Sequence, residues 1–280
     1  MSIWCDEVFE EKIRFGLSIK QTLFVGHSEF QKVSVVDTEA FGRALLIDDL
    51  WMTSEYDEKL YHEMIVHPAL CTAPRIARVL VIGGGDGGTV REVLRYPEVE
   101  HVDMVEIDAM VIEASKQFLP SIGTAWNDPR LKVHVADGLA WVAREDLPKY
   151  DVILVDGSDP VGPATGLFNE DFYRNCAARL SEQGVLVTQA ESPLLHREVH
   201  LDMIRTIGRA VGHAHPYYGP VVLYPSGAWS WIYASSCVAP KDIIDTRLAY
   251  IEEDCFIYNR ELHLGCFAQP NHIRKALRRS

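Results

Sequence analysis

The sequence lacks three features that would place the protein in a membrane, outside the cell or on nucleic acid. It has no apolar run near the roughly 20 residues that a membrane-spanning helix needs. Its first residues, MSIWCDE, carry acids and no basic start before an apolar stretch, so they do not predict a signal peptide. Its net charge is −13 at pH 7, whereas nucleic-acid-binding proteins usually present a basic face. We therefore expect neither a membrane partner nor a nucleic-acid partner.

Closely spaced cysteine pairs are also absent. The six cysteines are scattered along the chain and form no C-x-x-C motif. This spacing favours reduced thiols in the cytoplasm over a disulfide framework or a zinc site. The acidic excess has two interpretations that composition does not separate: it keeps the protein in solution, or part of it lines a pocket for a cationic substrate.

The chain has 280 residues, 48 % of them apolar, and can bury a substantial core. Short alternating segments in its first part predict strands at residues 18–25, 32–37 and 43–48. Apolar residues at helical spacing predict a helix over residues 57–70, with Pro68 and Pro74 marking its end. We expect a small N-terminal antiparallel β-sheet domain that ends in this helix, residues 1–72.

Strands and helices alternate in the rest of the chain, residues 73–280. Strands are predicted at 79–82, 101–107, 131–135, 150–155 and 184–188, and helices at 89–95, 110–118, 138–144, 170–180 and 197–211. A hairpin of 221–224 and 229–234 closes the predicted sheet, and the tail after Pro240 is predicted to be helical. This rhythm predicts an α/β fold with a doubly wound, mostly parallel, Rossmann-like sheet.

A glycine-rich turn follows the first strand of this sheet. The apolar run VLVI at 79–82 leads into GGGDGG at 83–88, where a strand meets the start of a helix. Such a turn is where an α/β sheet binds a nucleotide. Asp86 lies inside it, and a carboxylate there would repel a pyrophosphate. We therefore expect a ligand that carries positive charge near the turn.

Acids stand at the carboxyl ends of four successive predicted strands: Asp86, Glu106, Asp137 and Asp156. Glu106 lies 21 positions after Gly85, which is the offset of a carboxylate that binds ribose hydroxyls. Asp137, with Gly138 beside it, is placed to meet an adenine edge. Any one of these acids alone would be explained as a turn former or helix cap, but four at one sheet edge favour a binding site.

The loop DGSDPVGP at 156–163 is a second candidate site. Its carboxylates Asp156 and Asp159 lie three residues apart, and prolines that include Pro163 stiffen it. No histidine or further acid follows at ligand spacing, so we expect no metal. Glu191 adds an acid at the same sheet edge. Aromatic walls for a cationic chain are expected from Tyr61, Tyr224, Trp4, Trp229 and Trp231.

With these residues assembled, the chain resembles the spermidine synthase family of polyamine aminopropyltransferases over nearly its whole length. The motifs that carry the resemblance are GGGDGG at 83–88, EID at 106–108, DG at 137–138, DGSDP at 156–160, Gln189 with Glu191, and YPSG at 224–227. The family has a methyltransferase-type sheet. It transfers the aminopropyl group of decarboxylated S-adenosylmethionine to putrescine and yields spermidine and methylthioadenosine.

The resemblance also implies roles for single residues. The donor, which is a co-substrate and not a cofactor, would be held by Gln31, Asp86, Glu106, Asp137, Gly138 and Pro163, with His62 next to its aminopropyl end. The acceptor diamine would be held by Tyr61, Asp156, Asp159, Glu191 and Tyr224. Asp156 matches the family's catalytic acid. The family is usually dimeric or tetrameric, so the resemblance implies a homodimer or homotetramer assembled with the help of the N-terminal sheet.

The residues themselves agree with the donor that the resemblance implies. Ordinary S-adenosylmethionine would present a carboxylate to the glycine turn, whereas its decarboxylated form leaves only an ammonium there. Asp86 would repel the first and pair with the second.

Departures from the family pattern affect the acceptor more than the reaction. Where the family commonly has Gln in the segment before residue 57, this chain has Trp51-Met52-Thr53, and Val222-Leu223 replaces the common Pro-Thr before Tyr224. Putrescine is the expected acceptor, and cadaverine, agmatine or a longer polyamine are alternatives. Three other functions stay open: a methyltransferase, a nicotinamide oxidoreductase, and a polyamine-binding protein without catalytic activity.

Overall fold

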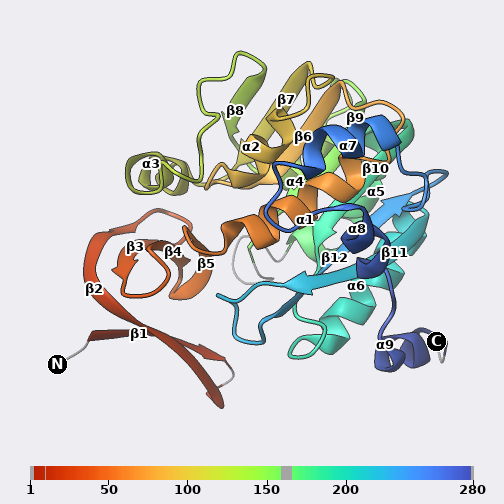
Figure 1. Ribbon diagram of the computed structural model, residues 1–280. Coiled ribbons are helices and arrows are strands. Elements are labelled where there is room, and N and C mark those ends of the chain that lie inside the picture. The colour runs from red at the N-terminus through yellow and green to blue at the C-terminus, as the bar shows by residue number, and fades with distance from the viewer. Residues whose placement is uncertain (1–2, 10, 159–165, 279–280) are drawn as a thin grey trace.

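Two β-sheets organise the protein (Figure 1). The computed structural model describes residues 3–9, 11–158 and 166–278. The first sheet is antiparallel, with its strands in chain order: β1 (Ile3–Phe9), β2 (Ile13–His27), β3 (Lys32–Thr38), β4 (Arg43–Ile47) and β5 (Leu50–Ser54). This confirms the small N-terminal sheet that the alternating segments predicted.

Two strands of this sheet, β1 and β5, were not predicted. Residues 5–7 of β1 read Cys-Asp-Glu, so the strand has no clear alternation of apolar and polar side chains. β5 is joined to β4 by only two residues, Asp48 and Asp49, both with positive φ (49° and 66°). Such a tight turn is typical of a two-residue hairpin, but aspartates signal it less clearly than Asn-Gly.

The second sheet has seven strands in the order β11-β12-β10-β9-β6-β7-β8. Five are parallel: β6 (Arg78–Gly83), β7 (His101–Glu106), β8 (Leu131–Val135), β9 (Tyr150–Asp156) and β10 (Leu180–Gln189). The antiparallel pair β11 (His213–Pro220) and β12 (Ala228–Ser235) completes one edge. The predicted doubly wound, mostly parallel sheet is confirmed.

The predicted hairpin has a wrong first strand. Residues 221–224 belong to the connection between the strands, and β11 lies earlier, at His213–Pro220. The sequence of β11, HAHPYYGP, has little apolar periodicity. It is held by the pairing with β12, where Tyr217 is fully buried and its ring stacks on Trp231 with 5.6 Å between centroids.

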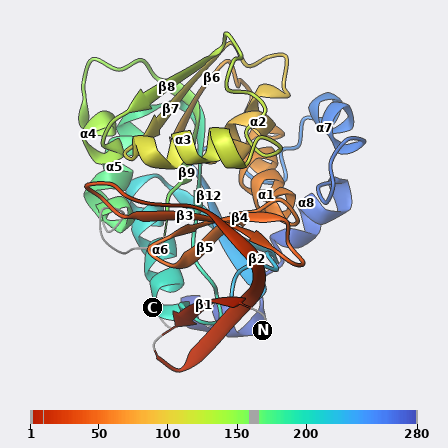
Figure 2. The same ribbon diagram turned by 90° about the vertical axis from the view of Figure 1, so that its left-hand side faces the viewer.

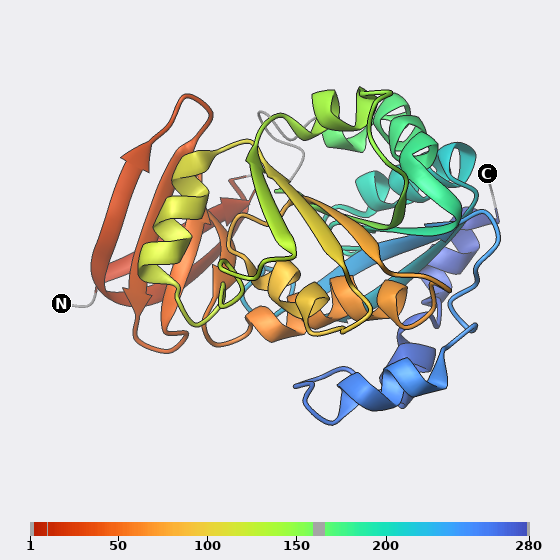
Figure 3. The same cartoon turned by 90° about the horizontal axis from the view of Figure 1, so that it is seen from above.

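Helices cover both faces of the large sheet (Figure 3). Along β6 the side chains alternate: Val79 and Val81 join the core with α1 and α2, and Leu80 and Ile82 join the core with α5 and α6. A strand buried on both faces in this way reads as a continuous apolar run. The helices are α1 (Glu58–Leu70), α2 (Gly88–Leu94), α3 (Ala109–Phe118), α4 (Gly138–Ala143), α5 (Glu170–Arg179), α6 (Arg197–Ala210), α7 (Asp245–Glu252), α8 (Arg260–Cys266) and α9 (Asn271–Leu277).

Helix α3 packs on the N-terminal sheet as well as standing beside the large one (Figure 2). Val111 and Ala114 of α3 share a buried cluster with Val33, Val35 and Leu45 of that sheet. The two sheets are therefore joined by an apolar contact, next to the pocket described below.

Helix α1 confirms the helix predicted over residues 57–70, and it contains Pro68 within its last turn. Pro68 has no N–H, so the carbonyl of Met64 has no partner within the helix. The hydroxyl of Tyr217 donates to that carbonyl at 2.7 Å. In the part of the chain that the structure describes, no helix is both long and apolar enough to cross a membrane.

Candidate active site

The pocket lies where the order of the parallel strands reverses, between β6 and β9. Gly83 at the end of β6 pairs with Asp156 at the end of β9, and the N–H of Gly84 donates to the Asp156 carbonyl at 2.9 Å. Both glycines have positive φ (81° and 72°), and a Cβ on Gly83 would overlap the Asp156 backbone. Only glycine allows this close approach. Ligands of doubly wound sheets bind at such a reversal.

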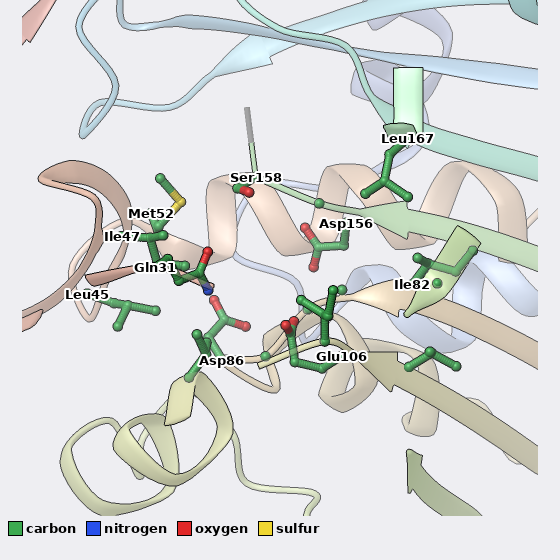
Figure 4. Close-up of a pocket in the computed structure, with 18 of the residues that line it drawn as sticks. Gln31, Leu45, Ile47, Met52, Ile82, Asp86, Glu106, Asp156, Ser158 and Leu167 are labelled. Carbon is green, nitrogen blue, oxygen red and sulfur yellow. The ribbon is translucent and has the colours of Figure 1, made fainter. Parts of the chain in front are cut away.

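The first cavity opens at this point and is closed from the other side by the N-terminal sheet (Figure 4). The carboxylates of Asp86, Glu106 and Asp156 surround it. Gln31, Leu45, Ile47 and Met52 come from the N-terminal sheet and its loops. Further lining residues are Tyr61, His62, Asp137, Gly138, Leu139, Ser158, Leu167 and Tyr224.

Asp86 has two partners in the protein. Its Oδ1 accepts a hydrogen bond from the N–H of Gly88 at 2.8 Å, and its Oδ2 lies 3.3 Å from Nε2 of His62. Burial acts to raise the pKa of Asp86, but His62 and the Gly88 N–H outweigh it and lower the pKa. Asp86 is therefore an anion at the edge of the cavity.

Asp156 is held by two hydroxyl groups. Tyr61 donates to its Oδ1 at 2.7 Å and Thr89 donates to its Oδ2 at 2.6 Å. Burial and the nearby charge of Asp86 raise the pKa of Asp156. The two aspartates of the pocket thus differ, since among the described residues His62 lies 3.3 Å from Asp86, whereas the side chains that donate to Asp156 are two neutral hydroxyls.

Glu106 is buried at the end of β7, where its Oε1 accepts the N–H of Asp108 at 3.0 Å. Burial raises its pKa to about 7. Gln31 donates through its amide to Asp108 at 3.1 Å. The loop after β2 is thereby fixed to the loop after β7, beside the carboxylate expected to bind ribose.

Asp137 and Gly138 lie at the start of α4. Asp137 caps the helix by accepting the N–H of Leu139 at 2.8 Å. Gly138 is buried, and a Cβ there would come to 2.5 Å from Ile82. Both residues line the first cavity, so the structure brings together the acids of all four strand ends.

A second cavity continues from the first. Met52, Tyr61, Gly157, Ser158 and Tyr224 line both. The remaining walls are Glu7, Val8, Phe9, Leu50, Trp51, Gln189, Ser192, Leu195, His196, Pro225, Ser226 and Trp229. Trp51 and Met52, which depart from the family pattern, lie in the wall of this cavity.

Tyr224 is fixed in this wall by two contacts. Its hydroxyl donates to the carbonyl of Met52 at 2.9 Å, and the adjacent Leu223 N–H donates to Asp57 at 2.8 Å. The loop between β11 and β12 is thereby joined to the start of α1.

Of the remaining residues predicted for the acceptor side, the structure describes Glu191. Glu191 is fully buried with φ of 64°, and Gln189 donates to it at 3.5 Å. It stands next to the second cavity but is not in its wall. Asp159 and Pro163 lie outside the described residues. Within those residues, no group of three or more histidine, cysteine or acidic side chains is arranged to hold a metal ion.

Three further residues of the site were not predicted. Thr89, immediately after the glycine turn, bonds Asp156. Glu58 and Arg91 form an ion pair behind His62, at 2.8 Å. The i, i+4 spacing of Glu58 and His62 on a predicted helix was a usable signal, whereas the pairing across α1 and α2 needs the tertiary fold.

The fold and the pocket together define a protein with a doubly wound sheet and a ligand site where the strand order reverses. Comparison with known proteins gives the family. The Spermine/spermidine synthase domain matches residues 58–242 and the Spermidine synthase tetramerisation domain matches residues 3–55. The chain belongs to the spermidine synthase family and is an aminopropyltransferase.

Individual relatives agree over the whole length. A polyamine aminopropyltransferase of Prochlorococcus marinus (strain MIT 9313) is 47 % identical, with 98 % of this chain and 96 % of the relative covered. A spermidine synthase solved in complex with the transition-state analogue AdoDATO has a TM-score of 0.95 and 32 % identity, over 99 % of this chain and 96 % of the other. The spermidine synthase of Thermotoga maritima has a TM-score of 0.94 and 32 % identity, with 99 % of this chain and 95 % of the other covered.

Proposed function

We propose that this aminopropyltransferase uses decarboxylated S-adenosylmethionine as donor and a diamine, putrescine in the first place, as acceptor. The products are then spermidine and methylthioadenosine. The observation that carries the proposal is the position of Asp156: it lines the first cavity and is hydrogen-bonded to Tyr61, which lines both cavities. A donor in the first cavity and an acceptor in the second would meet there.

The donor side is supported by the acids at the strand ends. Glu106 would accept hydrogen bonds from the ribose, and Asp137 with Gly138 would border the adenine. The ammonium of the aminopropyl group would pair with Asp86, where the carboxylate of ordinary S-adenosylmethionine would be repelled. This would select against methyl transfer at the stage of donor binding.

The chemistry we propose is an in-line displacement. The lone pair of a neutral acceptor amine forms a bond to the methylene next to the sulfonium, the C–S bond breaks, and the sulfonium becomes the thioether of methylthioadenosine. The acceptor amine has a pKa of about 10.4, so freeing its lone pair near pH 7.5 costs about 4 kcal/mol. Asp156 orients the amine and receives the proton as the new bond forms. Positioning of the two substrates supplies much of the remaining acceleration.

The acceptor side is supported by the composition of the second cavity. Aromatic rings and apolar side chains suit a methylene chain, and Glu7 in the wall, with Asp156 and Glu191 next to the cavity, would suit its ammonium groups. Tyr61, Tyr224, Asp156, Asp159 and Glu191 are the proposed acceptor-binding residues. Because Trp51 and Met52 change the wall, cadaverine, agmatine or a longer polyamine remain alternatives, since a methylene or two changes affinity by only about 1–3 kcal/mol.

We also propose that the protein works as a homodimer or homotetramer in the cytoplasm. The match of residues 3–55 to a tetramerisation domain supports an oligomer. Ile3 and Trp4 of β1 and Val25 of β2 are large apolar residues that are more than half exposed. Contact with a second copy would remove this surface from water.

Product identification tests the proposal. The protein is incubated with decarboxylated S-adenosylmethionine and one amine at a time: putrescine, cadaverine, agmatine or spermidine. We expect mass spectrometry to detect methylthioadenosine and the aminopropylated form of the amine that the protein accepts. D156N should bind the donor with unchanged affinity and lose turnover by roughly 10²- to 10⁴-fold. If D156N kept most of its turnover, the role of Asp156 would be wrong, and methylated products from S-adenosylmethionine would contradict the reaction.

A further inference from the structure

Four charged side chains of alternating sign form a chain that ends at the pocket. Arg91 of α2 donates to both carboxylate oxygens of Glu58, at 2.9 and 2.8 Å. Glu58 Oε2 lies 2.7 Å from His62 Nδ1, and His62 Nε2 lies 3.3 Å from Asp86 Oδ2. The side chains of His62 and Glu58 are only 2 % and 5 % exposed. Their charges are therefore balanced mainly by one another and not by water.

The geometry around His62 favours a ring that carries two protons. Both of its nitrogens face carboxylate oxygens, and an ionised carboxylate only accepts hydrogen bonds. A neutral imidazole would turn its lone pair toward either Glu58 or Asp86. Burial acts against protonation of His62, but Asp86 and Glu58 outweigh it and raise the pKa of the ring well above its ordinary value.

The other groups that face the ring do not change this balance. Tyr61 of α1 has its ring edge-on at 5.5 Å and keeps its proton, because burial and Asp156 raise its pKa. Asp156 of β9 feels the charge of His62, which acts to lower its pKa. Arg91 also contacts Glu92 at 2.8 Å, but Glu92 has its own cation in Arg95 at 2.6 Å. The charges of Arg91, Glu58, His62 and Asp86 then sum to zero when all four are ionised.

We infer that Glu58, held in place by Arg91, balances the charge of a permanently protonated His62, so that Asp86 can receive a cationic donor. An imidazolium without this counter-charge would repel the donor ammonium in a site of low dielectric. Asp86 keeps room for the donor, because a carboxylate offers about four lone pairs and two of them are engaged here. Glu58 is then a positioning residue that acts through His62. The inference rests on the proposed donor.

Substitution of Glu58 by Gln tests the charge balance. Glutamine both donates and accepts, so His62 can become neutral, with Nδ1 accepting from the amide and Nε2–H still directed at Asp86. The charges of Arg91 and Asp86 then sum to zero, so the net charge of the group is the same as in the wild type. Protonation of His62 at low pH adds one positive charge that no carboxylate balances. We expect E58Q to bind decarboxylated S-adenosylmethionine at least about tenfold more weakly than the wild type at pH 6, and within about threefold of it at pH 8.5.

Two further variants control this measurement. The double variant E58Q/H62Q has no group that titrates at position 62, so we expect its donor affinity relative to the wild type to be the same at both pH values. Arg95 directly follows α2 and donates to Glu92 at 2.6 Å, a residue that Arg91 also contacts at 2.8 Å, but replacing Arg95 leaves both hydrogen bonds from Arg91 to Glu58 in place. R95Q should therefore bind the donor like the wild type at both pH values.

Nitrogen NMR of the histidine rings gives a second, independent readout. In the ligand-free wild type at pH 8 we expect both ring nitrogens of His62 to carry protons. A neutral His62 ring at pH 8 would overturn the inference, and so would a loss of affinity in E58Q that is equal at both pH values, since that indicates a merely structural role. A wild-type protein that fails to bind the donor at any pH contradicts the proposed function instead, and the NMR measurement still decides the charge of His62.

Discussion

At the scale of single residues, the pocket holds carboxyl groups that face different surroundings. Asp86 faces an imidazole, Asp156 faces two hydroxyl groups, and Glu106 is buried against a backbone N–H. A charged partner lowers the pKa of a carboxyl group, and burial without one raises it. The proposed roles follow this order, with Asp86 as a permanent anion and Asp156 as a group able to take a proton.

The raised pKa of Glu106 predicts a stability effect that depends on pH. Folded Glu106 has a pKa of about 7, against 4.5 ordinarily, so between these values the folded protein keeps a proton that the unfolded chain has lost. Its contribution to stability therefore falls as pH rises from 4.5 to about 7. E106Q has no charge to bury, so we expect it to gain stability relative to the wild type across this window, by on the order of 3 kcal/mol above pH 7.

Urea unfolding at pH 5, 6, 7 and 8 measures this gain, and calorimetry measures donor binding by the same variant. We expect weaker donor binding by E106Q, because an amide replaces the carboxylate proposed for the ribose. A stability difference that stays constant with pH would show that burial of the carboxyl group is not its source.

The strand-end acids could be predicted because an acid directly after a short apolar run is visible in the sequence. The partners of these acids could not. Thr89 reaches Asp156 across 67 positions of the chain, and Arg91 reaches Glu58 across 33, so both contacts exist only once the strands and helices have packed.

At the scale of elements, the glycine turn and α1 must fit closely. A Cβ on Gly88, the first residue of α2, would overlap the ring of His62. We expect Gly88→Ala to displace the ring, to destabilise the protein by about 1–3 kcal/mol, and to weaken donor binding. Thermal unfolding and donor titration check both effects.

Gly265 in α8 is the matched control, because a Cβ there meets no heavy atom within 4 Å. Gly265→Ala should stabilise the protein by up to about 1 kcal/mol, since alanine is the better helix former. Equal effects of the two substitutions would contradict the steric role of Gly88.

The continuation of α1 through Pro68 gives a second test at this scale. The Tyr217 hydroxyl bonds the Met64 carbonyl, which Pro68 leaves without a helical partner. We expect Y217F to lower the free energy of unfolding by about 1–3 kcal/mol, because a buried carbonyl then loses its hydrogen-bond donor. In a P68A background the alanine N–H can bond that carbonyl, so the same substitution should cost less. A double-mutant cycle in urea measures the coupling, and no coupling would contradict the compensation.

Element boundaries were predictable where side-chain periodicity sets them. β6 and α2 are clear in the sequence, whereas β1, β5 and β11 depend on pairing with neighbouring strands. The strand β11, for example, contains two histidines and two prolines, yet all eight of its residues pair with β12. Pairing of this kind is tertiary and leaves little signal in the strand itself.

At the scale of the whole molecule, the acidic excess is partly internal. In the described ranges, ten acidic residues are buried, whereas Arg247 is the one buried Arg or Lys. Several of these acids join distant segments by accepting backbone N–H groups, as Glu63 does from residues 256–258. Neither general solubility nor a lined pocket alone explains the charge of −13, because part of it serves the fold.

The two-sheet architecture also places the pocket. Gln31, Leu45, Ile47 and Met52 come from the N-terminal sheet, and the acids come from the large one. The fold class was predictable from the alternation of strands and helices. The N-terminal sheet was predictable too, but the sequence did not indicate that it closes the pocket, since this depends on the docking of α3 and β3.

Donor selectivity tests the central claim most directly. Affinities for decarboxylated and for ordinary S-adenosylmethionine should be measured by calorimetry, in the wild type and in D86N. We predict that D86N loses roughly 10- to 100-fold in affinity for the decarboxylated donor, as expected for a lost hydrogen bond between charged groups, and loses none for ordinary S-adenosylmethionine. An unchanged ratio of the two affinities in D86N would contradict the pairing of Asp86 with the donor ammonium.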